Sequence, residues 1–114
     1  MRRTSTAGRY AERVLHGVDD GGAREQVVIW IERKTGGVWA VGRIVNPRHR
    51  RSDEPRPEDY AFEGYELDDA LEQANGLLDS DLKVSQQDGR GEIVPPFERD
   101  EVLRPLERWF FGRQ

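Results

Sequence analysis

Two strand-like runs joined by a tight turn are the feature of this sequence that most constrains its fold. Residues 26–33 alternate with a period of two, and apolar side chains occupy both faces at the centre of the run. Lys34-Thr35-Gly36-Gly37 follows, and its glycines supply the positive φ values that tight hairpin turns need. Residues 38–45 form the second run, in which the central Gly42 indicates a bulge or a close approach of another element. We expect the first of these strands to lie inside the sheet.

A third run extends this hairpin on its N-terminal side. Residues 9–18 show a modest period-two pattern in which Tyr10, Val14 and Val18 share one face. Asp19-Asp20-Gly21-Gly22 follows, and these residue types tolerate the backbone conformations of hairpin loops. The three runs therefore predict an antiparallel meander.

A long loop and a helix follow the meander. Residues 46–59 contain three prolines, four arginines and no large apolar residue, which predicts an exposed charged loop. Residues 60–65 then return as a short candidate fourth strand. From residue 67 to 79, apolar residues recur at i, i+4, i+7 and i+11, the stripe of a helix that packs across a sheet. Asp79-Ser80-Asp81 is expected to end this helix.

The last third of the chain is less regular. Residues 82–96 are compatible with an irregular hairpin or with a tethered loop, and the pattern does not choose between them. Residues 98–111 carry apolar residues at i, i+1, i+4, i+7 and i+8, which predicts a second amphipathic helix with a kink at Pro105. Residues 1–8 are polar and basic and are expected to be a disordered tail, so residues 9–114 form one domain.

These elements predict an α+β fold. It is a three- to four-stranded antiparallel β-meander with one helix packed on the sheet and a C-terminal helix closing the core.

Composition narrows the chemistry. The absence of cysteine excludes disulfides, thiol catalysis and cysteine zinc sites. No apolar stretch approaches the roughly 20 residues that span a bilayer, and residues 1–8 lack the apolar core of a secretory signal. A cytoplasmic protein without membrane association is expected, and the excess of arginine over lysine fits a GC-rich, bacterial type of genome.

Neither catalysis nor metal binding is indicated. His16 and His49 are the only histidines, and neither accompanies a nucleophile motif. The acidic run from Asp79 superficially matches a calcium loop, but Lys83 and Val84 stand where an oxygen ligand and a glycine are needed. We therefore expect no enzymatic activity, no cofactor and no metal.

Charge is unevenly distributed along the chain. Residues 1–57 carry 12 basic and 7 acidic residues, whereas residues 58–114 carry 6 basic and 15 acidic residues. Such asymmetry indicates either a basic binding face beside an acidic one, or two faces that attract each other in the folded protein. The second interpretation is preferred.

The basic loop is the first candidate binding feature. Clustered positive side chains attract phosphates, which favours contact with nucleic acid. Acidic residues in the same loop partly neutralise it, so a solvated charged loop remains the alternative. The candidate residues are Arg48, His49, Arg50, Arg51 and Arg56.

A resemblance adds three more candidates. The glycine–tryptophan strand Gly37-Val38-Trp39, the aromatic strand Phe62-Glu63-Gly64-Tyr65 and the helix start Asp68-Asp69 follow one another in the sheet-then-helix order that resembles AP2-type DNA-binding domains. In that family, arginine and tryptophan side chains of the sheet contact duplex DNA. The residues that the resemblance implies as contacts are Arg33, Trp39 and Arg43.

Aromatic residues suggest a third possibility. Trp30 on the second face of its strand and Trp109 in the terminal aromatic cluster are candidate contacts for a protein partner or a homodimer. The sequence thus favours a non-enzymatic macromolecular interaction module. The alternative is a nucleic-acid-binding module that uses the sheet and the arginine-rich loop.

Overall fold

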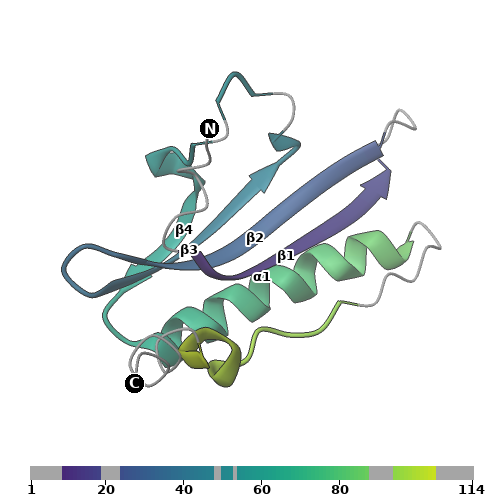
Figure 1. Ribbon diagram of the computed structural model, residues 1–114. Coiled ribbons are helices and arrows are strands. Elements are labelled where there is room, and N and C mark those ends of the chain that lie inside the picture. The colour runs from purple at the N-terminus through teal and green to yellow at the C-terminus, as the bar shows by residue number, and fades with distance from the viewer. Residues whose placement is uncertain (1–8, 19–23, 48–49, 53, 88–93, 105–114) are drawn as a thin grey trace.

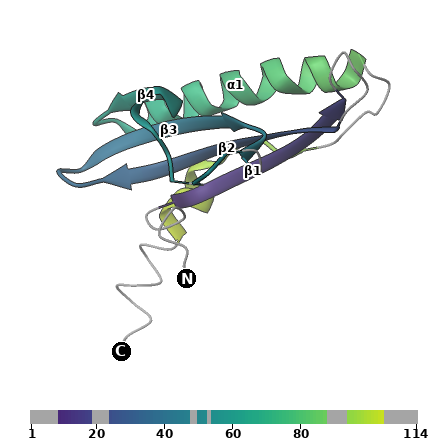
Figure 2. The same ribbon diagram turned by 90° about the horizontal axis from the view of Figure 1, so that it is seen from above.

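The computed structural model describes residues 9–18, 24–47, 50–52, 54–87 and 94–104. One open sheet holds four antiparallel strands in the order β1-β2-β3-β4 (Figure 1). The strands are β1 (Arg9–Val18), β2 (Arg24–Lys34), β3 (Val38–Val45) and β4 (Tyr60–Gly64). Helix α1 (Leu67–Gln87) contacts all four strands from one side, as Figure 2 shows. The predicted α+β meander is confirmed, and the fourth strand is present.

The sheet surface under α1, which we call the helix face, carries the main core. Alternate residues of each strand point to it, and Ile29 and Ile31 at its centre are completely buried. α1 covers them with the apolar stripe that begins at Leu67. The strand residues of this core are Ala11, Leu15, Val27, Ile29, Ile31, Trp39 and Val41, with Phe62 packed against them.

The opposite surface, which we call the outer face, holds a smaller cluster around Trp30. A Cβ atom at Gly42 would lie 2.2 Å from Cζ2 of the Trp30 ring, so only glycine fits there. The β3–β4 register also shifts between Val41 and Gly42. Both features expected of this mid-strand glycine, a bulge and a close approach, are therefore found.

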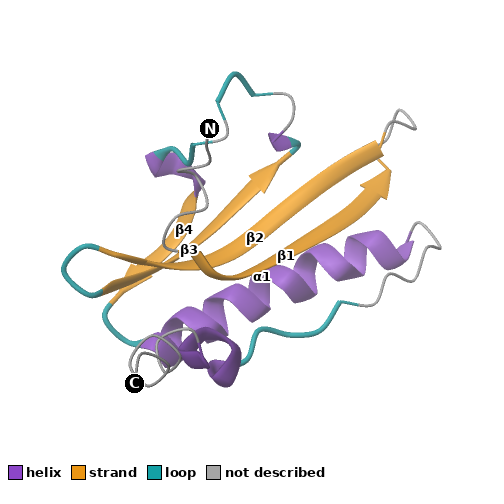
Figure 3. Ribbon diagram, in the orientation of Figure 1, coloured by secondary structure: helices purple, strands orange, loops and turns teal. Residues whose placement is uncertain are grey.

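Two further segments lie outside the sheet, the chain between β3 and β4 and residues 94–104 (Figure 3). In Figure 1 the chain between β3 and β4 arches away from the side that α1 covers, and it ends in the 3-10 helix η3 (Pro57–Asp59). Residues 94–98 are extended and run beside α1, and residues 99–104 are helical. Phe97 and Val102 of this segment belong to the main core.

The helix α1 is longer than predicted, because it continues to Gln87 instead of ending near residue 79. Asp79 and Ser80 are exposed on its solvent side, and Asp81 pairs with Arg43 of β3, so none of the three has to break the helix. The start of the 82–96 region is consequently helical, not a hairpin or loop. Part of the predicted C-terminal helix, including Pro105, lies outside the described residues, as do residues 1–8.

Candidate peptide-binding site between β1 and α1

The residues implied by the DNA-binding resemblance lie on the helix face. Trp39 is only 5% exposed and belongs to the core. Arg43 donates to Asp81 of α1 from Nε at 2.8 Å and from Nη2 at 2.7 Å, and this hydrogen bonding raises the pKa of Arg43. Arg33 is exposed and stacks 5.0 Å from the Trp39 ring centroid. Because α1 covers this face, Trp39 is buried and Arg43 is held beside Asp81 with its side chain 35% exposed, and the contact of these residues with a duplex stays a prediction.

The described arginines of the 46–59 loop differ in their surroundings. Arg50 pairs with Asp59 of η3, with 2.9 Å between Nη1 and Oδ2, and its side chain is 12% exposed. Arg51 and Arg56 are exposed. Arg48 and His49 lie outside the described residues.

Trp30 is also enclosed, with 0% of its surface exposed. The guanidinium of Arg9 lies 4.0 Å from its ring centroid, and the Tyr60 ring meets it edge-on at 5.8 Å. Its indole nitrogen and the Tyr60 hydroxyl both donate to Oε1 of Glu32, each at 2.7 Å. Burial, and next the bond to Glu32, raise the pKa of Tyr60, so this phenol stays protonated at neutral pH. Trp30 therefore offers no contact surface to a partner, and Trp109 lies outside the described residues.

The basic first half and the acidic second half of the chain form ion pairs with each other in the fold. Four ion pairs each join a basic residue of the first half to an acidic residue of the second half. They are Arg13–Glu101, Lys34–Glu63, Arg43–Asp81 and Arg50–Asp59. This supports the interpretation that the two charge-biased halves attract each other.

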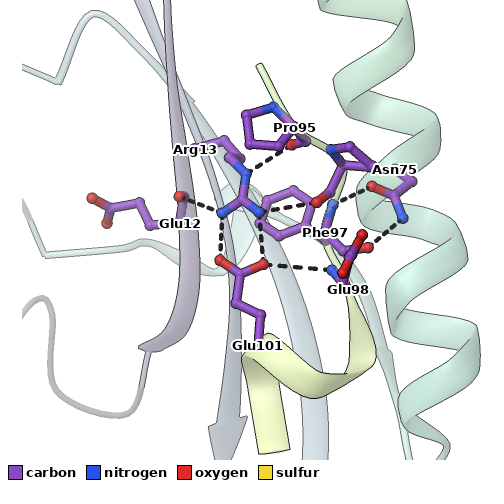
Figure 4. Close-up of polar contacts among 8 residues, drawn as sticks. Glu12, Arg13, Asn75, Pro95, Phe97, Glu98 and Glu101 are labelled. Carbon is purple, nitrogen blue, oxygen red and sulfur yellow. Dashed lines mark hydrogen bonds and ion pairs between the residues drawn. The ribbon is translucent and has the colours of Figure 1, made fainter. Parts of the chain in front are cut away.

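The most developed polar site of the described residues surrounds Arg13 of β1, which points from the helix face toward residues 94–101 (Figure 4). Its Nε donates to the carbonyl of Pro95 at 2.9 Å, and its Nη2 donates to the carbonyl of Pro96 at 3.0 Å. Glu101 accepts from both terminal nitrogens at 2.6 Å, and Nη1 also donates to the carbonyl of Glu12 at 3.0 Å. These five hydrogen bonds match the five N–H groups of a guanidinium.

Asn75 of α1 holds the same segment from the other side. Its Oδ1 accepts from the backbone nitrogen of Phe97 at 2.7 Å, and its Nδ2 donates to the carbonyl of Phe97 at 3.0 Å. The Phe97 side chain is 3% exposed, and Arg13 lies 4.6 Å from its ring centroid. Arg13 and Asn75 thus bind the main chain of three consecutive residues, while one aromatic side chain anchors them.

Electrostatics complete the site. Hydrogen bonds from Arg13 lower the pKa of Glu101, although partial burial acts in the opposite direction. Glu101 also accepts from the backbone nitrogen of Glu98 at 3.4 Å, which ties the start of the helical turn to the extended part. Chemically, the site holds an extended chain through its carbonyl groups, an aromatic side chain and a carboxylate.

Sequence reasoning missed both Arg13 and Asn75. Each looks like an ordinary polar position on a strand or beside a helix stripe. The signal that could have found the site is Pro95-Pro96-Phe97, because two prolines favour an extended conformation and leave their carbonyls without local partners.

In comparisons with known proteins, no family model, curated protein or solved structure matches the chain. Within the described ranges, no helix is long and apolar enough to cross a membrane. Nor does the described part of the chain gather three or more His, Cys, Asp or Glu side chains as a metal site would require.

Proposed function

We propose that this protein is a non-enzymatic protein-interaction module that recognises, between β1 and α1, an extended Pro-Pro-Phe segment with an acidic residue four positions after the phenylalanine. The observation that carries the proposal is the set of backbone contacts made by Arg13 and Asn75 around the buried Phe97. In the structure, residues 94–104 of the same chain occupy this site. A partner with the same pattern would make the same contacts in their place.

The contacts share features with a known mode of peptide recognition. Proline-rich segments adopt an extended helix without internal hydrogen bonds, so they lose little conformational entropy on binding, and their carbonyls are free to accept. Arg13 donates hydrogen bonds to the carbonyls of Pro95 and Pro96, and Phe97 provides the aromatic anchor typical of binding hot spots. The Arg13–Glu101 pair adds a requirement for an acidic residue four positions after the aromatic one.

Attachment to the same chain favours the segment already present. A tethered segment has an effective concentration of roughly millimolar, so a partner must bind more tightly or act when residues 94–104 are displaced. The test therefore needs a chain whose own segment is weakened. Phe97→Ala does this, because it removes the anchor and leaves Arg13 and Asn75 intact.

Fluorescence anisotropy of a labelled peptide with the sequence of residues 94–104 tests the proposal. The Phe97→Ala chain should bind this peptide, and adding Asn75→Ala should weaken binding at least about tenfold, equivalent to about 1.4 kcal/mol. Gln73→Ala, an exposed position on the same helix, is the matched control and should leave binding unchanged. If the Phe97→Ala chain keeps its circular dichroism spectrum and binds no peptide, the proposal is refuted.

Nucleic-acid binding through the sheet is less well supported, because Trp39 and Arg43 are engaged with the core and with α1. The arginine-rich loop is a separate matter, because Arg50 retains unused donors.

A further inference from the structure

Three buried side-chain atoms of the described residues have no hydrogen-bond partner, and all three are guanidinium nitrogens on the outer side of the sheet. They are Nε of Arg9, and Nε and Nη2 of Arg50. Arg9 lies over the Trp30 ring, which meets the ring of Tyr60, and Arg50 pairs with Asp59. Arg50 thus contacts Asp59, and Arg9 is linked to the adjacent Tyr60 through the Trp30 ring.

Arg50 is fixed in place without using its best pair of donors. Nη1 makes the ion pair with Asp59, whose Oδ2 also accepts from the backbone nitrogen of Arg56 at 2.7 Å. Nε and Nη2 form another edge of the planar group, where two N–H bonds lie side by side. Arg43 uses these same two nitrogens to hold both oxygens of Asp81. In Arg50 the corresponding edge is buried and has no acceptor, whereas in Arg43 it binds a pair of oxygens.

We propose that the Nε/Nη2 edge of Arg50 binds a phosphate group. Buried N–H donors are almost always satisfied, and a guanidinium edge matches two oxygens of a carboxylate or a phosphate. Because the two nitrogens have almost no solvent exposure, a phosphate reaches them only when neighbouring side chains of the loop move aside. Arg51, next in sequence, adds a positive charge, whereas Asp59 opposes any anion.

The negative charge of Asp59 lies beside the proposed phosphate site, so removing it should change the affinity for phosphate. A purely structural role for Arg50 predicts no such change. Replacing Asp59 by asparagine keeps an oxygen acceptor near Arg56 but removes the negative charge beside the site. Phosphate affinity should then rise several-fold. Arg50→Lys should abolish binding, because an ammonium group keeps the charge but lacks the two-donor edge.

The experiment follows the arginine Nε–H signals of the full chain by ¹H–¹⁵N NMR while inorganic phosphate is added at constant ionic strength. The Arg50 signal, identified by its loss in the Arg50→Lys variant, should shift in a saturable way, and the Asp59→Asn variant should saturate at a lower phosphate concentration. Arg51→Gln is the matched control from the same loop and should change the affinity less than about twofold, since weak surface charges contribute little.

A second arm replaces phosphate with single-stranded and duplex oligonucleotides and follows the same Arg50 signal. A shift with oligonucleotides identifies the bound group as a nucleic-acid phosphate, whereas a shift with inorganic phosphate alone identifies a small phosphate ligand. The inference is overturned if the Arg50 signal stays fixed far above millimolar phosphate. It is also overturned if Arg51→Gln abolishes the saturable shift of the Arg50 signal.

Discussion

Arg13 and Arg50 are equally enclosed, each with a side chain 12% exposed, and each pairs with a carboxylate. They differ in the rest of the guanidinium group. Every N–H of Arg13 has an acceptor, three of them main-chain carbonyls, whereas two nitrogens of Arg50 have none. An arginine with all its donors bound to its own chain supports packing, while one with an unused edge retains the capacity to bind something else.

The segments that the two arginines hold also differ, in what they contribute to the main core. Residues 94–104 contribute Phe97 and Val102 to the main core, so the polar contacts of Arg13 act together with apolar burial. The described part of the 46–59 loop contributes no residue to that core. Stability is therefore expected to depend on the first segment much more than on the second.

Replacing each arginine by glutamine is the most direct way to break this comparison. Arg13→Gln should lower the free energy of unfolding by about 2–4 kcal/mol, because it leaves Glu101 and the carbonyls of Pro95 and Pro96 without their donor. Arg50→Gln should cost less, about 1–2 kcal/mol, because it leaves the enclosed Asp59 without its cation but also removes two unsatisfied donors. Urea denaturation measures both, and equal losses would show that the two sites are energetically alike.

Gly42→Ala perturbs the outer face alone. The new methyl group would meet the Trp30 ring at 2.2 Å, so the ring or the strand must move, at a cost of about 1–3 kcal/mol. Thermal unfolding followed by tryptophan fluorescence detects the change. Gly76→Ala is the control, because a Cβ at that exposed helix position meets nothing within 4 Å and should stabilise α1 slightly. A Gly42→Ala chain as stable as the original would mean that the outer cluster repacks freely.

The smallest expected effect is on the stability of the protein at low pH. Hydrogen bonds from Arg13 lower the pKa of Glu101 below its usual 4.5. A carboxyl group whose pKa is lower in the folded state stabilises the fold above its unfolded pKa, and this contribution disappears as the pH falls through the folded pKa. Between about pH 5 and pH 3, the original chain should therefore lose more stability than Arg13→Gln. Parallel pH dependences for the two proteins would separate Glu101 from the acid response.

The strands could be predicted from sequence because their signals are local. The glycines of the β2–β3 turn, Gly36 and Gly37, do have positive φ values of 87° and 79°, and β3 has the predicted bounds. The end of α1 was predicted wrongly because Asp79-Ser80-Asp81 resembles a helix stop. Only the distant partner Arg43 shows why Asp81 is stable within the helix.

The candidate site could not be predicted for the same reason. Arg13 lies more than 80 residues from every member of the segment that it holds, and no local pattern encodes such a pairing. The charged residues of the 46–59 loop were visible in the sequence, but the engagement of Arg50 by Asp59 depends on how the loop folds back. Composition showed that charges were present, and only the fold showed which were already neutralised.

The four ion pairs that join the two halves also bear on how the protein is made. During synthesis residues 1–57 emerge first, and their 12 basic and 7 acidic residues give them a net charge of +5 before any of their later partners exist. Arg13, Lys34, Arg43 and Arg50 therefore gain their carboxylate partners only after the second half has been synthesised.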